Sequence, residues 1–299
     1  MAEKFPIIKV SPDAPSEGED LGTKEKFWFH HQSFGRCLYK KARPNTGEDW
    51  AEKIAAELCE LLGLPHAIYE LAIFKGERGT VSPSFVPEGG SLTFGNEILA
   101  RIVPKYLQEY KNPSQHTVEI ILNAIGDAAV NLPIDWKPPE GINTVAETFI
   151  GYLLLDAWIG NTDRHHENWA FIILSDKAHL APTYDHASSL GRELLDEKRR
   201  LKLQQKSVTA YVEKCTSAIY ACDTYKKPLK TFDAFAVAAG RYPNAARIWL
   251  DYLARVSTTD TLKLFHRIQG DRISPTAIEF AHKILELNQS RLLKLRDPL

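Results

Sequence analysis

The feature that most constrains this chain is a polar loop between an apolar helix and an apolar hairpin. Residues 149–159 (FIGYLLLDAWI) are apolar enough to predict a buried helix, which ends at Gly160. Residues 161–167 are polar and turn-prone, and residues 169–181 predict two short strands joined by a tight turn.

Three side chains in and after this loop have the chemistry that phosphoryl transfer requires. Asp163 and Asn168 lie in the loop, and Asp185 follows the second strand. One carboxylate can orient an attacking hydroxyl and accept its proton, while an amide and a second carboxylate can hold magnesium on the phosphates. The order of helix, loop, hairpin and metal-binding Asp is typical of the larger lobe of protein-kinase-like folds. A helix–strand corner capped by Asp163 and Asn168 is the alternative explanation.

The wording of these motifs resembles a known family. GNTDRHHENWAF followed by LAPTYDHASSLG resembles the C-terminal kinase domain of HipA-family serine/threonine kinases, and DRHxxxN is also similar to phosphatidylinositol 3- and 4-kinases. The resemblance implies that Asp163 is the catalytic Asp and that Asn168 and Asp185 bind magnesium. Arg164 and His165 stand beside the catalytic Asp, where either could neutralise phosphate charge or simply stabilise the loop.

The residues that precede the first long strand are candidates for a phosphate-covering loop. Residues 26–30 and 34–41 alternate like two paired strands. Glycines and cations before and within the first strand could bring backbone amides and positive charge to a nucleotide, although a plain surface loop explains them equally well. These nucleotide-binding candidates are Gly22, Thr23, Lys24 and Lys26.

A lysine near the end of the second strand is the candidate phosphate-binding cation. Lys40 resembles the strand lysine of kinases, which pairs with the α- and β-phosphates. We prefer Lys40 to Lys41 because side chains alternate along a strand, and Leu38, on the same face as Lys40, should point inward. Two exposed strand lysines are the structural alternative.

The next element predicts a partner for this lysine. Apolar residues spaced from Trp50 to Leu62 indicate a helix. In a kinase-like fold a Glu on this helix holds the strand lysine in place, and the resemblance favours Glu52, with Glu48 and Glu57 as alternatives. A solvated helix Glu remains the other explanation.

A change from strands to helices predicts the lobe boundary. Residues 66–74 and 80–86 predict strands, after which Pro and Gly interrupt the pattern and helices dominate. We therefore predict an α+β, bilobal protein-kinase-like fold, with a small β-rich N-lobe over residues 1–86 and a larger, mostly helical C-lobe over residues 87–299. In the resembled family the hinge backbone binds adenine, and the candidates here are Phe85, Val86 and Glu88.

The helical part begins with two amphipathic segments, residues 96–111 and 117–131. Residues 193–206 (ELLDEKRRLKLQQK) form a charge run interspersed with leucines, which we interpret as a solvated helix face. This run follows the metal-binding Asp, where kinases carry their activation segment. Further amphipathic helices are expected between residue 234 and residue 295.

Composition narrows the class of protein. The net charge of −1 gives no reason to expect direct nucleic-acid binding or a membrane surface. The longest apolar run is too short to span a bilayer, and Asp156 interrupts it. The beginning of the chain does not resemble a signal peptide, and four cysteines without a CxxC pair favour free thiols. We therefore expect a cytoplasmic protein.

The leading hypothesis is an ATP- and Mg²⁺-dependent HipA-like kinase that phosphorylates Ser or Thr of a protein. The resemblance implies a protein substrate and leaves open an antitoxin or other regulatory partner, although we expect the chain to lack the additional N-terminal domain of full-length HipA toxins. A lipid or small-molecule kinase of the same wider fold is one alternative, and near neutrality counts against a phosphoinositide substrate. An inactive nucleotide-binding regulatory module is the other alternative.

Overall fold

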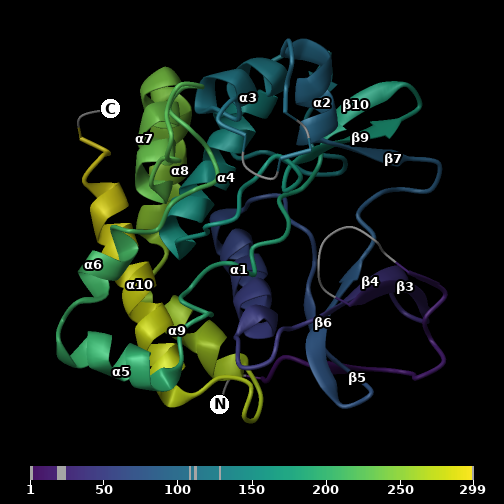
Figure 1. Cartoon of the computed structure of the whole chain (residues 1–299), viewed down its shortest axis with the longest axis vertical. Coiled ribbons are helices and arrows are strands. Elements are labelled where there is room, and N and C mark those ends of the chain that lie inside the picture. The colour runs from purple at the N-terminus through teal and green to yellow at the C-terminus, as the bar shows by residue number, and fades with distance from the viewer. Residues whose placement is uncertain (1–2, 19–24, 108, 111–112, 128, 298–299) are drawn as a thin grey trace.

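The protein has a β-rich part and a helical part, with one helix between them (Figure 1). The computed structural model describes residues 3–18, 25–107, 109–110, 113–127 and 129–297. This architecture confirms the predicted α+β, bilobal kinase-like fold. Among the described helices, none combines the length and the apolar character needed to cross a bilayer.

A six-stranded sheet forms the N-terminal part, in the order β1-β5-β6-β4-β3-β2, with β1 parallel to β5 and the other pairs antiparallel. Phe27, Tyr39 and Phe74 cluster on one face, with ring centroids 4.6–5.5 Å apart. A slip of one residue would bury charged side chains in place of these rings, so the cluster fixes the register. The strands are β1 Ile7–Val10, β2 Glu17–Gly18, β3 Lys26–His31, β4 Gly35–Lys41, β5 Glu70–Phe74 and β6 Glu77–Pro83.

Helix α1 (Glu48–Leu62) connects this sheet to the helical part. It ends at Gly63, whose φ of 70° is the left-handed conformation that glycine adopts most easily. Leu58 of α1 shares one core with Leu71 of β5 and Phe265 of a late helix. The main core therefore contains residues from both sides of position 86 in the sequence. The division into lobes at that residue remains a prediction.

A second, four-stranded sheet has the order β7-β9-β10-β8. Its hairpin, β9–β10, lies where the sequence predicted it, and its two turn residues have the positive φ typical of tight hairpins. The two outer strands were not predicted, and a single helix over residues 117–131 was wrong, because that helix ends at Ile125. The strands are β7 Ser91–Phe94, β8 Val130–Asn131, β9 Ala170–Leu174 and β10 Lys177–Leu180.

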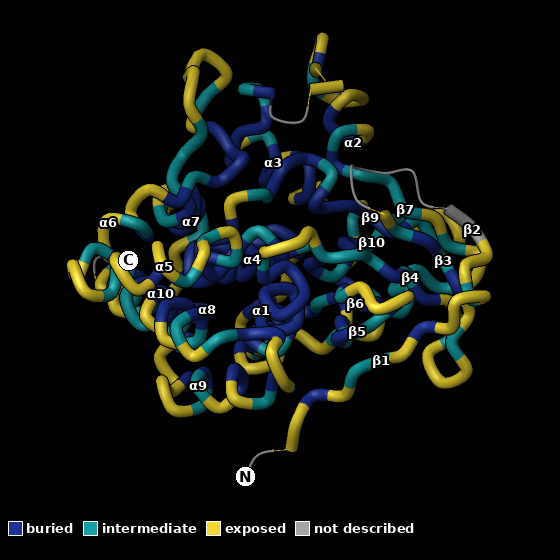
Figure 2. Tube along the Cα trace, turned by 60° about the horizontal axis from the view of Figure 1, so that its bottom comes forward, coloured by how far each residue is buried: buried dark blue, intermediate teal, exposed yellow. Residues whose placement is uncertain are grey.

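Helix α4 is the centre of the helical part. Thr144 and Glu147 form a capping box at its start, and Gly160 ends it with a φ of 66°. It is apolar on all sides and therefore buried, like α1, at the middle of the molecule (Figure 2). The helices are α2 Gly95–Ile102, α3 Val118–Ile125, α4 Val145–Ile159, α5 Asp196–Gln204, α6 Val208–Val212, α7 Thr231–Arg241, α8 Pro243–Arg255, α9 Thr258–Arg267 and α10 Pro275–Leu293.

Helix α2 is shorter than the predicted residues 96–111. It ends at Ile102, and Val103 after it has an extended conformation, with φ −107° and ψ 116°. Pro104 follows, and the residue before a proline disfavours the helical conformation.

Candidate active site

The fully buried side chain of Arg164 holds the loop between α4 and β9 in place. The guanidinium of Arg164 donates to both carboxylate oxygens of Asp156, at 2.7 and 2.9 Å, and to the carbonyl of Asn168 at 2.6 Å. Asn161 also donates to the Asp156 carboxylate, at 2.7 Å. Burial alone would lower the pKa of Arg164, but Asp156 more than offsets this and raises it, so the guanidinium stays charged.

The main chain at Asp163 is held on both sides. Its N–H donates to the Asn161 side chain at 3.2 Å, and its carbonyl accepts from the Asn168 amide at 2.6 Å and from the His165 N–H at 2.8 Å. The His165 ring accepts from the Glu167 N–H and lies with Nε2 4.0 Å from the Asp163 carboxylate. That carboxylate is 29% exposed, so it is presented to solvent by a constrained loop.

Arg164 also connects this loop to the segment that carries Asp185. Arg164 donates to the Thr183 hydroxyl at 2.9 Å and to Nε2 of His186 at 3.1 Å. Burial, followed by the charge of Arg164, holds the pKa of His186 well below its usual range, so the ring is neutral and can accept this bond. Asp163 and Asp185 are the chain neighbours of these two side chains, so the structure brings the loop of Asp163 and the segment of Asp185 together.

The backbone at Asp185 has an unusual conformation that its surroundings hold. Its φ of 57° lies in the left-handed region, which Asp tolerates better than most residues. Its N–H donates to the Tyr69 hydroxyl at 3.1 Å. The next two N–H groups, of His186 and Ala187, donate to the Glu52 carboxylate at 2.6 and 3.1 Å. Glu52 thus fixes the chain just after the acidic residue.

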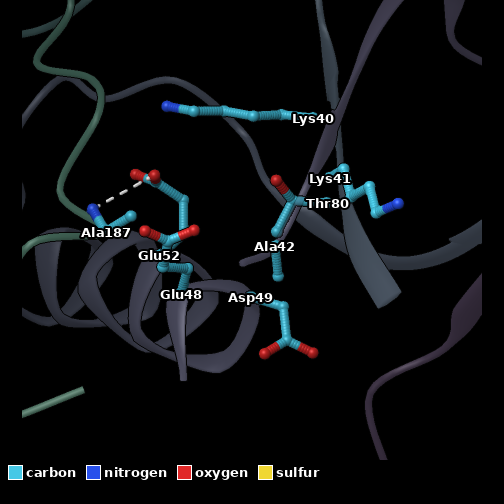
Figure 3. Close-up of a pocket in the computed structure, with 8 residues that line it drawn as sticks. All are labelled: Lys40, Lys41, Ala42, Glu48, Asp49, Glu52, Thr80 and Ala187. Atoms are coloured by element: carbon cyan, nitrogen blue, oxygen red, sulfur yellow. Dashed lines mark hydrogen bonds between the residues drawn. The ribbon is translucent and has the colours of Figure 1, made fainter. Parts of the chain in front are cut away.

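The side chain of Lys40 reaches Asp185 from strand β4 of the six-stranded sheet. Its ammonium forms an ion pair with the Asp185 carboxylate, and the two side chains are 16% and 34% exposed. Burial alone would lower the pKa of Lys40, but the charges of Asp185 and Glu52 together raise it. A cavity of only about 10 Å³ lies against Lys40, Glu52 and Ala187. Figure 3 shows Lys40 extending towards the side where Glu52 meets Ala187, and Lys41 pointing the opposite way.

The reason for choosing Lys40 was only partly right. Leu38 and Lys40 do share a face of β4, but Leu38 is half-buried, whereas Cys37 and Tyr39 on the other face are fully buried. Lys26 lies directly opposite Lys40 on β3, so both point to the same side of the sheet. The predicted loop residues Gly22, Thr23 and Lys24 lie outside the described residues.

The hinge candidates follow β6. The Phe85 ring stacks on Tyr184, with centroids 5.5 Å apart, and Val86 packs in the same small cluster. The N–H of Val86 donates to the Ser84 hydroxyl at 3.3 Å. Glu88 is exposed. A nucleotide bound to the Val86 amide would have to replace the Ser84 hydroxyl.

The predicted metal ligands present oxygen atoms. The amide nitrogen of Asn168 donates to the Asp163 carbonyl, so its side-chain oxygen is the atom that could bind a metal ion, and Asp185 contributes a carboxylate. Magnesium usually takes one or two protein oxygens and completes its shell with water and phosphate. These two residues therefore fit magnesium, without the larger cage that calcium would require.

Some site residues were not singled out from the sequence. Arg164 was noticed but its role stayed open, and Asp156, Thr183 and Tyr69 were not identified. The signal for Asp156 was present, because a lone carboxylate inside an apolar helix needs a buried partner. Thr183 and Tyr69 gave no comparable signal.

Comparisons with known proteins agree on the fold. A proinflammatory kinase of Helicobacter pylori, CtkA, superposes with a TM-score of 0.74 and 17% identity, covering 97% of this chain and 99% of that chain. HipA of Shewanella oneidensis MR-1, solved with HipB and operator DNA, gives a TM-score of 0.60 and 11% identity, covering 94% of this chain and 67% of that chain. No family model and no curated protein sequence matches. The chain therefore has the HipA-like kinase fold, as its motifs predicted.

Proposed function

We propose that the protein transfers the γ-phosphoryl group of ATP to a Ser or Thr hydroxyl of a protein substrate, with Mg²⁺ bound at the site. The observation that carries this proposal is the contact between Arg164 and His186, which joins the loop of Asp163 to the segment of Asp185. The HipA-like fold supports the same reading, because positioning and charge neutralisation are what phosphoryl transfer needs from a protein.

Asp163 would orient the acceptor hydroxyl. As the hydroxyl oxygen bonds to the γ-phosphorus, the bond from phosphorus to the β–γ bridging oxygen breaks, and the hydroxyl proton passes to the Asp163 carboxylate. This carboxylate is partly exposed, while its backbone is held by Asn161 and Asn168, which is the combination that a positioned base requires. Asn168 and Asp185 would hold the metal ion, which neutralises charge on the phosphates.

Lys40 would change partners when the nucleotide binds. In this structure its ammonium neutralises Asp185. Phosphate oxygens of ATP would offer the lysine a second anion, and the Asp185 carboxylate would then be able to hold the metal ion. Glu52 would keep the backbone after Asp185 in place throughout, because its two hydrogen bonds involve main-chain N–H groups.

The remaining nucleotide contacts are part of the same proposal. Lys26 lies on the Lys40 side of the sheet, and His165 lies beside Asp163. Phe85 and Val86 are offered for the adenine. A regulatory protein partner is a further possibility to test, since the HipA structure contains HipB.

A transfer assay with radiolabelled ATP tests the proposal, with and without magnesium. Asp163→Ala should lower the rate about a thousandfold or more and retain nucleotide binding. Asp185→Ala should weaken magnesium-dependent nucleotide binding. Asp233→Ala, at an exposed position on α7, is the matched control and should leave both unchanged. If the Asp163 and Asp185 variants keep full activity, the roles are wrong. Label found in lipid or a small molecule would favour the alternative kinase class.

A further inference from the structure

A second hollow, of about 420 Å³, adjoins the catalytic loop. The residues that line this groove include Lys202 of α5, Ala210 and Tyr211 of α6, and Thr162. The Thr162 hydroxyl and N–H both donate to the Ser188 carbonyl, at 3.2 and 3.0 Å, which fixes the position of Thr162 in the lining. Thr162 immediately precedes Asp163, and neighbouring Cα atoms are about 3.8 Å apart. One residue of the groove lining is therefore the chain neighbour of the candidate base.

The groove has the size and the lining of a binding site. Its volume falls within the roughly 300–1,000 Å³ that is usual for ligand pockets. Ser207, Ala210 and Thr216 line it with small side chains, which leave room for an extended chain. Tyr211 adds one half-buried aromatic ring.

The charge of the groove is positive, although the whole chain has a net charge of −1. Lys202 and Lys214 line it, and neither forms an ion pair with any residue that the structure describes. Lys202 lies 5.8 Å from the centre of the Tyr211 ring. The one acidic residue among the described lining residues, Glu193, accepts a hydrogen bond of 2.7 Å from the Tyr211 hydroxyl. Two lysines and one carboxylate thus leave the lining with a net positive charge, which can meet an anionic ligand.

We propose that this groove binds the polypeptide segment flanking the acceptor Ser or Thr and selects Asp or Glu in that segment through Lys202 and Lys214. The inference rests on the proposed kinase function and names the class of its substrate. A partly exposed ion pair contributes about 0.2–1 kcal/mol. Two such pairs together predict a preference of about twofold to thirtyfold for acidic over neutral peptides.

A binding experiment tests the preference without requiring catalysis. Two fluorescent peptide pools would share one central Ser and differ only in having Glu or Gln around it, and their binding to the Asp163→Ala protein would be measured by anisotropy. The Glu pool should bind about twofold to thirtyfold more tightly at low salt, and the preference should shrink in 0.5 M NaCl. Changing both Lys202 and Lys214 to Glu should reverse it.

A control on the same helix separates a built site from diffuse charge. Lys198→Ala removes an exposed cation of α5 that does not line the groove, and it should leave the preference unchanged. Equal binding of the two pools would overturn the inference. An effect of Lys198→Ala as large as that of the double variant would also overturn it. A melting curve like that of the parent confirms that the double variant is folded.

Transfer kinetics on the unmodified protein then distinguish the two proposals. If both hold, the Lys202 and Lys214 changes should raise KM for the Glu pool and leave kcat nearly unchanged. Transfer to both pools with equal KM would sink the acidic preference and leave the kinase function standing. Acidic preference in binding without any transfer would sink the Ser/Thr kinase function and leave the groove as a peptide-binding site.

Discussion

The candidate site contains two ion pairs, each formed by a basic side chain and an aspartate. At the loop that carries Asp163, Arg164 and Asp156 form a two-pronged pair whose side chains are 0% and 3% exposed. On the sheet side, Lys40 and Asp185 form a single contact whose side chains are 16% and 34% exposed. Arg164 makes further hydrogen bonds to Asn168 and Thr183, so it is bonded in several directions.

The difference between these pairs separates a fixed part of the site from an exchangeable part. Removing one member of a buried pair leaves an uncompensated charge, whereas a partly exposed charge can turn to water or to a ligand. The Arg164 pair therefore sets the shape of the loop that carries Asp163. The Lys40 pair can change partners without loss of the fold, as nucleotide binding would require.

The largest expected effect comes from breaking the buried pair. Arg164→Leu should reduce the free energy of unfolding by about 3–5 kcal/mol, because Asp156 is left buried and unpaired. Urea denaturation measures this change. Arg247→Leu, at an exposed position on α8, is the matched control and should stay within about 0.5 kcal/mol of the parent. A loss below about 1 kcal/mol for Arg164→Leu would contradict the idea that the Arg164 pair is fixed while the Lys40 pair is exchangeable.

Acidification should also reduce the stability of the fixed part of the site, which contains the Arg164 pair and several buried histidines. Beneath the loop, burial lowers the pKa of His116 to about 3 and that of His166 to about 4, and His186 lies well below its usual range. In the unfolded chain these rings take up protons near pH 6.5, but the folded chain does not. Stability present above pH 6.5 is therefore lost as the pH falls, by at most about 1.4 kcal/mol per pH unit for each ring.

The variant His116→Asn sharpens this pH prediction. His116 accepts from the Trp169 indole at 3.1 Å and contacts the Ala218 carbonyl at 2.9 Å, so its neutral form is the one that fits. Unfolding in urea at pH 5, 6 and 7 should show a shallower loss of stability in His116→Asn than in the parent. Parallel curves would mean that His116 is not among the groups responsible.

The smallest effect on stability is expected on the sheet side. Lys40→Met should change the free energy of unfolding by less than about 1 kcal/mol, since Asp185 keeps access to water. The same change should weaken binding of ATP, measured by titration calorimetry, because a phosphate partner is lost. Lys41→Met, which points the other way, should retain ATP binding. A large loss of stability in Lys40→Met would show that this pair is also part of the fixed scaffold.

Strong local patterns explain how much of the site could be predicted. The helix over residues 145–159 and the hairpin after it were predicted close to their observed bounds, because apolar runs and capping residues act within a few positions. The strands β7 and β8 were missed because each is short and its partner is distant in the chain. For Glu52, the sequence indicated a lysine partner, whereas its described hydrogen bonds go to the backbone of His186 and Ala187.

The sequence alone determined which chemical groups are present and on which local elements they lie. Asp163, Asn168 and Asp185 could be identified because their spacing follows from one helix, one loop and one hairpin. Only the tertiary structure decided that Arg164 meets His186 and that Thr162 shares a groove with α5 and α6. Local elements depend on backbone hydrogen bonds and side-chain periodicity over a few residues, but contacts between distant segments depend on how the whole core packs.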